Sequence, residues 1–532
     1  MKNSYGMLLV GCSALALAGC GPSDIASPGS GGNITINNPT PAPTPTPTPT
    51  GGALVTPAGG CPTIADPQGL TDGGTITGPT GTYRVCTLPS LIKVSSTLAK
   101  VSGVLYEMNG RVNVGCDGGF SAPSTGTPFT STTVGCTTTP LTADTNVTLT
   151  IAAGAILYGK TGQSWLAVNR GNKISAVGTA TQPIIFTSRD NVQGLNDDNS
   201  QGQWGGVVLM GRGVVTGPCA VGSVGSSTCE RDTEGSADLA RFGGADNTYN
   251  AGRMSFIQIR YSGFVLGANK ELQSLTLEGV GTGTVVDHFQ SHNSSDDGTE
   301  IFGGAANMKY YIAAGADDDS LDVDTGAQAN VQYALLLQKP GKGDALFEID
   351  SDNDEADTPR TKLAVANFTA LQPQSSPDNE AADRAAGLFR GNSDTTLING
   401  IIATPNNECI RINGSGTTPA TLTAFSTVLQ CNSTKYLGTG SLNATQVQTA
   451  FGSGANNNSD AFTPTLSSIF INGTNESGVT ATNPATTSSF FDVTTWIGAV
   501  RNAADTWYSG WTCNATFTFT TGGSACTSLP TT

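Results

Sequence analysis

Residues 296–304 read DDGTEIFGG, and a similar stretch, DDDSLDVDTG, returns at residues 317–326. The tetrapeptide NMKY at 307–310 likewise returns as NVQY at 330–333, so the offset between the copies drifts from 21 to 23 residues. A looser third copy is DALFEID at 344–350. A period in the low twenties, with two or three short strands in each copy, is the length of one coil of a parallel β-helix.

The rest of the chain agrees with this architecture. From about residue 145 it consists of short β-branched runs, such as VTLTI at 147–151, separated by Gly, Asn and Asp without helical crossovers. A sandwich or a propeller would fit the strands alone, but the repeat selects an all-β, single-stranded right-handed parallel β-helix. Since coils stack at roughly 4.8 Å, we expect an inward amide ladder of Asn307 and Asn330 and stacked rings of Tyr310 and Tyr333.

Composition restricts the partners. The 532-residue chain has 68 Gly, only 12% charged residues and a formal net charge of −16, with no basic cluster. These values exclude electrostatic binding to nucleic acid or to anionic lipid. Cations or neutral ligands are the expected partners.

The N-terminus predicts export and a lipid anchor. Lys2 precedes an apolar run at 7–18, and Leu17-Ala18-Gly19-Cys20 has the pattern of a bacterial lipobox, so Cys20 is the predicted site of diacylglycerol and palmitate attachment. Gly21 after the cysteine favours the outer membrane, on its periplasmic face or at the cell surface. The alternative is an ordinary secretory leader in which Cys20 is incidental.

The predicted organisation has five parts. They are a signal peptide (1–19), a lipidated Pro/Thr-rich tether (20–60), an N-terminal disulfide-bearing cap (61–140), the β-helix (141–515) and a C-terminal tail (516–532). The tether contains alternating Thr and Pro, which favours extended polyproline II.

Ten cysteines beyond Cys12 and Cys20 fall into sequence-adjacent couples. The couples are Cys61 with Cys86, Cys116 with Cys136, Cys219 with Cys229, Cys409 with Cys431, and Cys513 with Cys526. An even count in an exported chain suits local disulfides, although sequence does not prove their connectivity. Metal binding is the weaker alternative, because no Cys-x-x-Cys spacing occurs and the chain has only two histidines.

Several phrases between residues 145 and 515 resemble a family of large exported lipoproteins of Gram-negative bacteria, mostly of unassigned function. The phrases lie at 154–159, 178–188, 204–211, 295–304 and 496–500, with Trp507 and Trp511 near the end. The resemblance implies a right-handed β-helix and a surface location but no settled chemistry. It also implies a TonB-dependent outer-membrane transporter as a partner.

Residues 296–357 carry fifteen Asp or Glu against three Lys, a net charge of −12. Stacked coils would bring these carboxylates together, and hard oxygen ligands with loose geometric demands favour Ca²⁺. The candidate ligands are Asp296, Asp297, Asp317, Asp318, Asp319, Asp322, Asp324, Asp350, Asp352 and Asp354. An EF-hand at 350–361 is excluded by Glu355 and Thr361, and the alternative is a solvated acidic face whose Asp residues make turns.

A carbohydrate-active enzyme on the same coils is the competing hypothesis. A lyase would need a base beside the cation, for which Lys309, Arg384, Arg390 or Arg411 are candidates. A hydrolase would need paired carboxylates. The Asp296-Asp297 pair with Arg411 and Asn413 is faintly similar to the polygalacturonase pattern, but its Gly-His-Gly element is absent.

Two smaller clusters complete the candidates. His288 and His292 share a face if their strand is regular, which would suit a transition-metal site, but two lone histidines are more often surface or turn residues. Trp204, Trp496, Trp507 and Trp511 are candidates for a sugar-stacking platform, with closure of the solenoid ends as the preferred alternative.

Together these observations predict a lipid-anchored, non-catalytic binding or envelope-structural protein. Its expected ligands are Ca²⁺ on the acidic segment and a glycan.

Overall fold

The computed structural model describes residues 54–236, 238–267, 270–351, 356–374, 385–416, 418–519 and 523–531. The predicted leader, the lipidation site Cys20 and most of the tether lie outside these residues. Within the described part of the chain, none of the helices has the length and apolarity that crossing a membrane requires.

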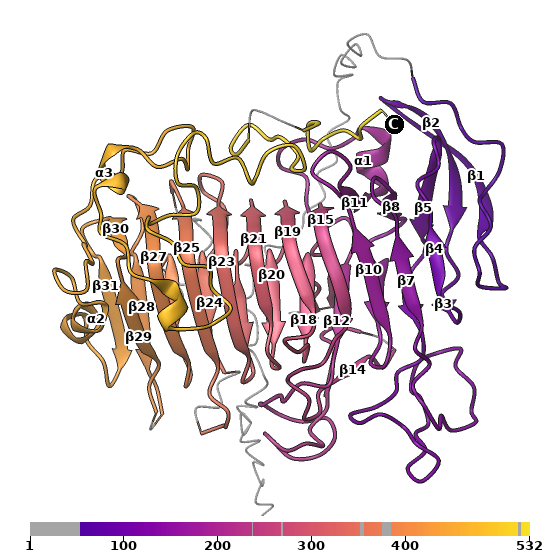
Figure 1. The fold of residues 1–532 in the computed structure, drawn as a ribbon, viewed down its shortest axis with the longest axis horizontal. Helices are drawn as coiled ribbons and strands as arrows, with labels where there is room; N and C mark the ends of the chain where they lie inside the picture. The colour runs from indigo at the N-terminus through magenta and orange to yellow at the C-terminus, as the bar shows by residue number, and fades with distance from the viewer. Residues whose placement is uncertain are drawn as a thin grey trace, which may run out of the picture.

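Parallel strands stack side by side along the whole length of the molecule in two long sheets (Figure 1). The 11-stranded sheet runs in the order β3 (Leu91–Ile92), β6 (Arg111–Val114), β9 (Trp165–Val168), β12 (Gly206–Met210), β18 (Leu275–Glu278), β20 (Thr299–Phe302), β22 (Asp322–Asp324), β24 (Phe347–Ile349), β26 (Gly387–Phe389), β28 (Ile410–Gly414) and β31 (Tyr436–Gly440). We call this sheet face 1.

The 16-stranded sheet holds two further rows. Its main path is β1 (Thr71–Gly78), β2 (Gly81–Thr87), β5 (Val104–Met108), β8 (Ile156–Gly159), β11 (Ile184–Ser188), β15 (Gly252–Arg260), β19 (Val285–His292), β21 (Asn307–Ala314), β23 (Gln328–Leu337), β25 (Lys362–Leu371), β27 (Asp394–Thr404) and β29 (Thr421–Phe425). Beside it lie β4 (Ser96–Leu98), β7 (Thr148–Ile151), β10 (Lys173–Val177) and β30 (Val428–Cys431). All these neighbours pair in parallel except β1 and β2.

Each coil therefore has three faces. β15 pairs along its first half with β10 and along its second half with β11, so one long strand continues both rows. We call the row of first halves face 2 and the row of second halves face 3. These observations confirm the predicted all-β parallel β-helix.

A column of left-handed residues makes the corner between faces 2 and 3. Its members lie in register on successive coils with φ between 48° and 61°: Phe256, His288, Tyr310, Tyr333, Asn367, Asn399 and Ser426. Such backbone costs about 1–3 kcal/mol for a residue with a side chain, and the stacked neighbours hold it in place. We call these residues the corner column.

The predicted ladders lie on these coils. The rings of Tyr310 and Tyr333 stack with centroids 4.8 Å apart, as expected. Asn330 Nδ2 donates to Asn307 Oδ1 at 2.9 Å, so the amide ladder exists. It faces outward rather than inward, because both asparagines are half-buried and alternate with the core residue Met308.

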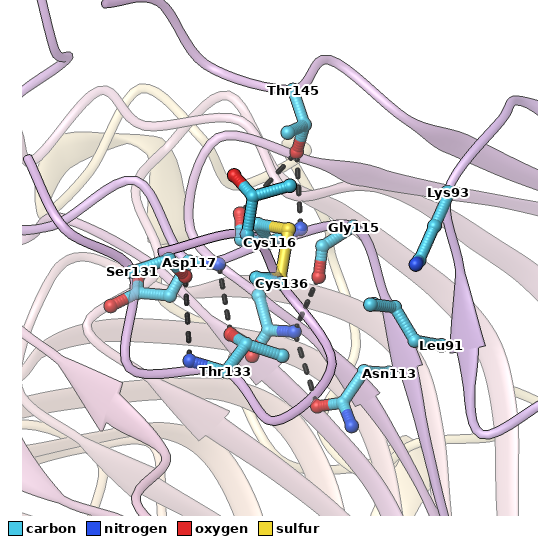
Figure 2. Close-up of a disulfide and its surroundings, with 12 residues drawn as sticks. Leu91, Lys93, Asn113, Gly115, Cys116, Asp117, Ser131, Thr133, Cys136 and Thr145 are labelled. Carbon is cyan, nitrogen blue, oxygen red and sulfur yellow. Dashed lines mark hydrogen bonds between the residues drawn. A yellow bond between two sulfur atoms is a disulfide. The ribbon is translucent and has the colours of Figure 1, made fainter. Parts of the chain in front are cut away.

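The coils begin before the expected boundary at residue 141. Parallel pairing already joins β2 to β5 and β3 to β6, inside the region expected to form a cap. Only the loop at 115–147 protrudes, and the Cys116–Cys136 disulfide closes it (Figure 2). In that loop Thr133 Oγ1 accepts from the Asp117 amide at 3.0 Å and Thr145 Oγ1 from the Cys116 amide at 3.1 Å. The early coils lack the acidic repeat, so periodicity could not reveal them.

The coils also end earlier than the expected residue 515. The last strand is β31, and Val447 and Phe451 of α2 (Ala444–Phe451) pack on the open end of the core. Beyond them the chain turns back and runs along the solenoid to a C-terminus near α1 (Arg189–Gln193), as the yellow segment of Figure 1 shows. We call residues 459–519 and 523–531 the C-terminal strap; it contains α3 (Thr474–Ser477) and the 3₁₀ turn η1 (Pro484–Thr486).

Amide side chains hold the strap on the outer side of face 3 and its corner. Gln290, Gln332 and Asn399 each accept from the N–H and donate to the C=O of one strap residue, at 2.8–3.3 Å. These strap residues are Cys513, Asp492 and Thr482, respectively. Apolar side chains of the strap, including the fully buried Trp511, cover Ile312 and Leu335 of the sheet. The tryptophans of the strap, Trp496, Trp507 and Trp511, thus lie along the middle coils, not at the solenoid ends.

Disulfide bonds join all five predicted couples: Cys61–Cys86, Cys116–Cys136, Cys219–Cys229, Cys409–Cys431 and Cys513–Cys526. Two short hairpins, β13 (Arg231–Asp232) with β14 (Arg241–Phe242) and β16 (Val265–Gly267) with β17 (Lys270–Glu271), belong to insertions beside face 1.

Candidate functional site

Acidic side chains of two successive coils converge where face 3 turns into face 1. Asp296 and Asp297 end the turn before β20, and Asp318 occupies the equivalent turn before β22. Glu300 and Asp322 follow on the strands and lie opposite each other in register. Their neighbours Ile301 and Val323 are in the core, so the alternation of a strand turns both carboxylates outward.

Ligand atoms of these five residues lie close together. One oxygen each from Asp296, Asp297 and Asp318 fall within 4.8 Å of one another, and so do oxygens of Asp297, Glu300 and Asp322. Asp297 belongs to both groups and joins them. We call the five residues the carboxylate cluster.

The cluster is buried although it carries ionisable groups. None of its five residues is more than 3% exposed. Burial raises the pKa of Asp296 to about 7. Burial, followed by repulsion from neighbouring carboxylates, raises the pKa of the other four well above their ordinary values. A buried carboxylate with carboxylate neighbours must take up a proton or a cation.

Backbone hydrogen bonds fix part of the cluster and leave the remaining oxygens unpaired. Asp296 Oδ1 accepts from the Asp297 amide at 2.8 Å, and Asp297 Oδ1 accepts from the Asp319 amide at 2.9 Å. Six buried oxygens of the cluster have no hydrogen-bond partner among the described residues: Asp296 Oδ2, Asp297 Oδ2, Asp318 Oδ1, Asp322 Oδ1 and both carboxylate oxygens of Glu300. The cluster thus offers hard carboxylate oxygens in two overlapping groups of three, and oxygens of this kind are the ligands that Ca²⁺ prefers.

Two further acidic residues with raised pKa values lie near the cluster. Burial raises the pKa of Glu271 to about 8, with repulsion from Asp296 as the next cause. Burial likewise raises the pKa of Glu278, on the neighbouring strand β18, to about 8. One coil beyond the cluster part of the negative charge is offset, because Arg390 pairs with Glu348 at 3.0 Å and with Asp350 at 3.1 Å.

The structure separates the predicted metal ligands into groups. Asp296, Asp297, Asp318 and Asp322 are in the cluster, and Asp319 adjoins it but accepts from the Ala345 amide at 2.7 Å. Asp317 lies outside, where it pairs with Lys342 at 3.2 Å. Asp324 accepts from the Thr325 amide, and Asp350 pairs with Arg390. Asp352 and Asp354 lie outside the described residues.

The sequence-based prediction did not include Glu300, which the structure places in the carboxylate cluster. The signal was present in the repeat, because Glu300 precedes Asp322 by one coil length and the two align in the register of β20 and β22. The predicted ligands are all aspartates, whereas this residue is a glutamate at the second position of strand β20.

The residues proposed for catalysis do not converge on the cluster. Lys309 pairs with Asp492 of the strap at 2.7 Å, and its strand β21 belongs to the other sheet. Arg411 shares the outward column of Glu300 on face 1, but it lies four strands further along, about 19 Å at the usual strand spacing. Arg384 lies outside the described residues.

The two histidines do not form a site together. His288 belongs to the corner column and stacks between Phe256 and Tyr310, with centroids 4.2 and 4.3 Å away. The left-handed conformation at His288 breaks the alternation that would place both side chains on one face. His292 is fully buried, and burial holds its pKa well below the ordinary value. The cysteines beside it, Cys513 and Cys526, are joined in a disulfide and offer no thiolate.

The chain matches a known protein family. A family model described as a pectate-lyase-like beta helix domain covers residues 130–512. Comparison with the curated proteins and with the solved structures found no match. The matched region contains most coils, the carboxylate cluster and most of the strap, and the family's architecture agrees with the observed parallel coils. The chain belongs to the pectate-lyase-like beta-helix domain family.

Proposed function

We propose that this protein is an exported, non-catalytic binding protein whose coils hold a Ca²⁺ ion in the carboxylate cluster. The observation that carries the proposal is the set of six buried, unpaired carboxylate oxygens on two adjacent coils. A Ca²⁺ ion there would neutralise the repulsion within the cluster and join the turn before β20 to the turn before β22. Its binding energy would therefore stabilise the stacking of the coils.

Protons are the competing means of neutralising the cluster. A protonated carboxyl gains a donor, and neighbouring carboxylate oxygens lie close enough to accept from it. Asp296, with a pKa raised to about 7, keeps its proton only in part of the molecules in neutral solution. A divalent cation satisfies several oxygens at once, which single protons do not.

The test is thermal unfolding of the purified full-length protein with Ca²⁺ and with excess chelator, together with equilibrium dialysis of the metal. We expect about one bound Ca²⁺ and a melting temperature that rises with Ca²⁺. Glu300→Gln is expected to abolish both effects. The matched control is Asp317→Asn, a carboxylate of the same segment outside the cluster, which should leave both intact. The absence of bound Ca²⁺ in the unmodified protein would overturn the proposal.

The location rests on the N-terminal sequence. The lipobox at 17–20 supports a diacylated Cys20 and attachment to the outer membrane through the tether. Mass spectrometry of the protein from a membrane fraction tests this assignment, and an unmodified Cys20 would contradict it. Co-purification with a TonB-dependent transporter, lost when Cys20 is replaced, would support the accessory role implied by the lipoprotein resemblance.

A carbohydrate-active enzyme is the second candidate. It is favoured by the family match and by Arg390 beside Glu348 and Asp350 on face 1. A lyase would release unsaturated products from polygalacturonate and a hydrolase reducing ends. Either activity, if lost in Arg390→Lys, would replace the non-catalytic assignment.

A further inference from the structure

A second site lies between the corner column and the C-terminal strap, away from the carboxylate cluster. It is a pocket of about 410 Å³, and four of its lining residues are aromatic: Tyr310, Tyr333, Trp496 and Trp507. The tyrosines come from successive coils and the tryptophans from the strap. The pocket is thus completed only when the strap is docked.

The aromatic part of the pocket is rigid. Tyr310 stacks between His288 and Tyr333, with centroids 4.3 and 4.8 Å away, so both ring faces are occupied and the ring edge is left for a ligand. Trp507 approaches Tyr310 at 5.3 Å and donates its Nε1 hydrogen to Ala499 O at 3.0 Å. The lining groups are therefore held in place before any ligand binds, which lowers the entropic cost of binding.

Polar groups complete the lining from a short exposed segment of the strap. Arg501, Asn502 and Asp505 all line the pocket. Asp505 Oδ2 accepts from the Arg501 amide at 2.9 Å, and the Arg501 guanidinium lies 5.2 Å from the ring centroid of Trp496. The segment offers both hydrogen-bond donors and acceptors beside the indole rings.

Charge decides which ligand class fits. Arg501 and Asp505 carry opposite charges in the same lining, so the polar segment has no net charge that would select a cation or an anion. A purely apolar ligand would make no use of the hydrogen-bonding groups of Arg501, Asn502 and Asp505. A neutral molecule with apolar C–H surfaces and many hydroxyl groups satisfies both the rings and the polar segment. Pockets of this size with an aromatic lining and a few fixed polar groups are typical small-ligand sites.

We propose that this pocket binds a sugar ring of a neutral oligosaccharide. The inference names the ligand class of the binding protein proposed above, but it does not depend on the Ca²⁺ ion. The hydroxyl groups would exchange hydrogen bonds with Arg501, Asn502 and Asp505, and the C–H surface would contact the indole rings.

The test is isothermal titration calorimetry of the full-length protein with cellohexaose, maltohexaose, hexagalacturonate and choline at millimolar concentrations. We expect saturable binding of at least one neutral hexasaccharide, and none of choline. Arg501→Ala combined with Asn502→Ala should weaken that binding at least about tenfold, equivalent to about 1.4 kcal/mol. Both residues are exposed, so the fold should tolerate the change, and Asn199→Ala at another exposed site is the matched control.

Each outcome decides the proposal. Binding of hexagalacturonate or choline alone would overturn the charge argument, and no saturable binding would overturn the site. Binding that survives the double substitution would place the saccharide elsewhere. Because the melting experiment with Ca²⁺ uses other residues, failure of either proposal is distinguishable from failure of the other.

Discussion

Replacing Asp296 by asparagine should stabilise the protein when Ca²⁺ is removed and weaken its response to Ca²⁺. Asn keeps the acceptor for the Asp297 amide while it removes the charge. The pKa of Asp296 rises from the ordinary 3.8 to about 7 because the side chain is buried. At about 1.4 kcal/mol for each pH unit, this difference costs the folded state up to about 4 kcal/mol.

The sign follows from proton linkage. A carboxyl that binds its proton more tightly in the folded state destabilises that state increasingly as the pH rises above 3.8, and the cost is complete once the pH exceeds about 7. With chelator, the free energy of unfolding of Asp296→Asn should therefore exceed that of the unmodified protein by up to about 4 kcal/mol at pH 8 but by only about 2 kcal/mol at pH 5. For a chain of 532 residues the unfolding entropy is about 1 kcal/mol/K, so the melting temperature should rise by about 4 °C at pH 8.

Calorimetric melting at the two pH values, with chelator and with Ca²⁺, checks this prediction. Ca²⁺ at about one hundred times its Kd should raise the free energy of unfolding of the unmodified protein by about 2.7 kcal/mol. The same Ca²⁺ concentration should stabilise the variant clearly less. Asp317→Asn, outside the cluster, is the control for charge alone. A lower melting temperature of Asp296→Asn in chelator, with an unchanged Ca²⁺ response, would refute the reasoning.

Three further variants test packing and ion pairing elsewhere in the molecule. Gln332→Ala leaves one N–H and one C=O of the strap without partners, so urea unfolding should show a free energy of unfolding lower by about 2–4 kcal/mol. A decrease below about 0.5 kcal/mol would contradict the role of Gln332 in holding the strap. Arg170→Ala leaves the carboxylates of Asp117 and Glu230 buried without their cationic partner, so urea unfolding should show a free energy of unfolding lower by about 3–5 kcal/mol. An unchanged free energy of unfolding would mean that the two carboxylates take up protons at little cost. Cys513→Ser with Cys526→Ser removes a crosslink over 13 residues, so the strap should be cleaved faster in limited proteolysis, and an unchanged rate would show that its packing alone holds it.

The sequence predicted the coils where the repeat was strong. The copies at 296–304 and 317–326 differ by one coil, and the structure places Glu300 against Asp322 and Tyr310 against Tyr333. Periodicity could not show which face each residue occupies, because the left-handed residue at the corner shifts the alternation halfway along the strand. For that reason the pair Asn307 and Asn330 was expected inside the coil.

The strap could not be predicted from its own composition. Residues 459–519 have few β-branched runs and no coil-length repeat, and their partners are amides some 80 to 220 residues earlier, such as Asn399 and Gln290. A single Gln or Asn in a strand gives no signal of a distant segment. The carboxylate cluster was partly predictable, since its charge is local in sequence, but its burial was not.

The two proposed sites share a physical origin in the stacking of coils. In a solenoid, equivalent positions of successive coils lie one above another and share the same environment. Like charges at such positions therefore repel one another coil after coil, and left-handed backbone conformations at such positions add their strain. Amide members of the corner column, such as Asn367, offset this cost by hydrogen bonds to the strap backbone. The aromatic members Tyr310 and Tyr333 make no such backbone bond among the described residues, and beside them the strap segment around Arg501 and Asp505 is exposed. The pocket therefore lies where the column changes from amide to aromatic, as the carboxylate cluster lies where the repeat places acids on adjacent coils.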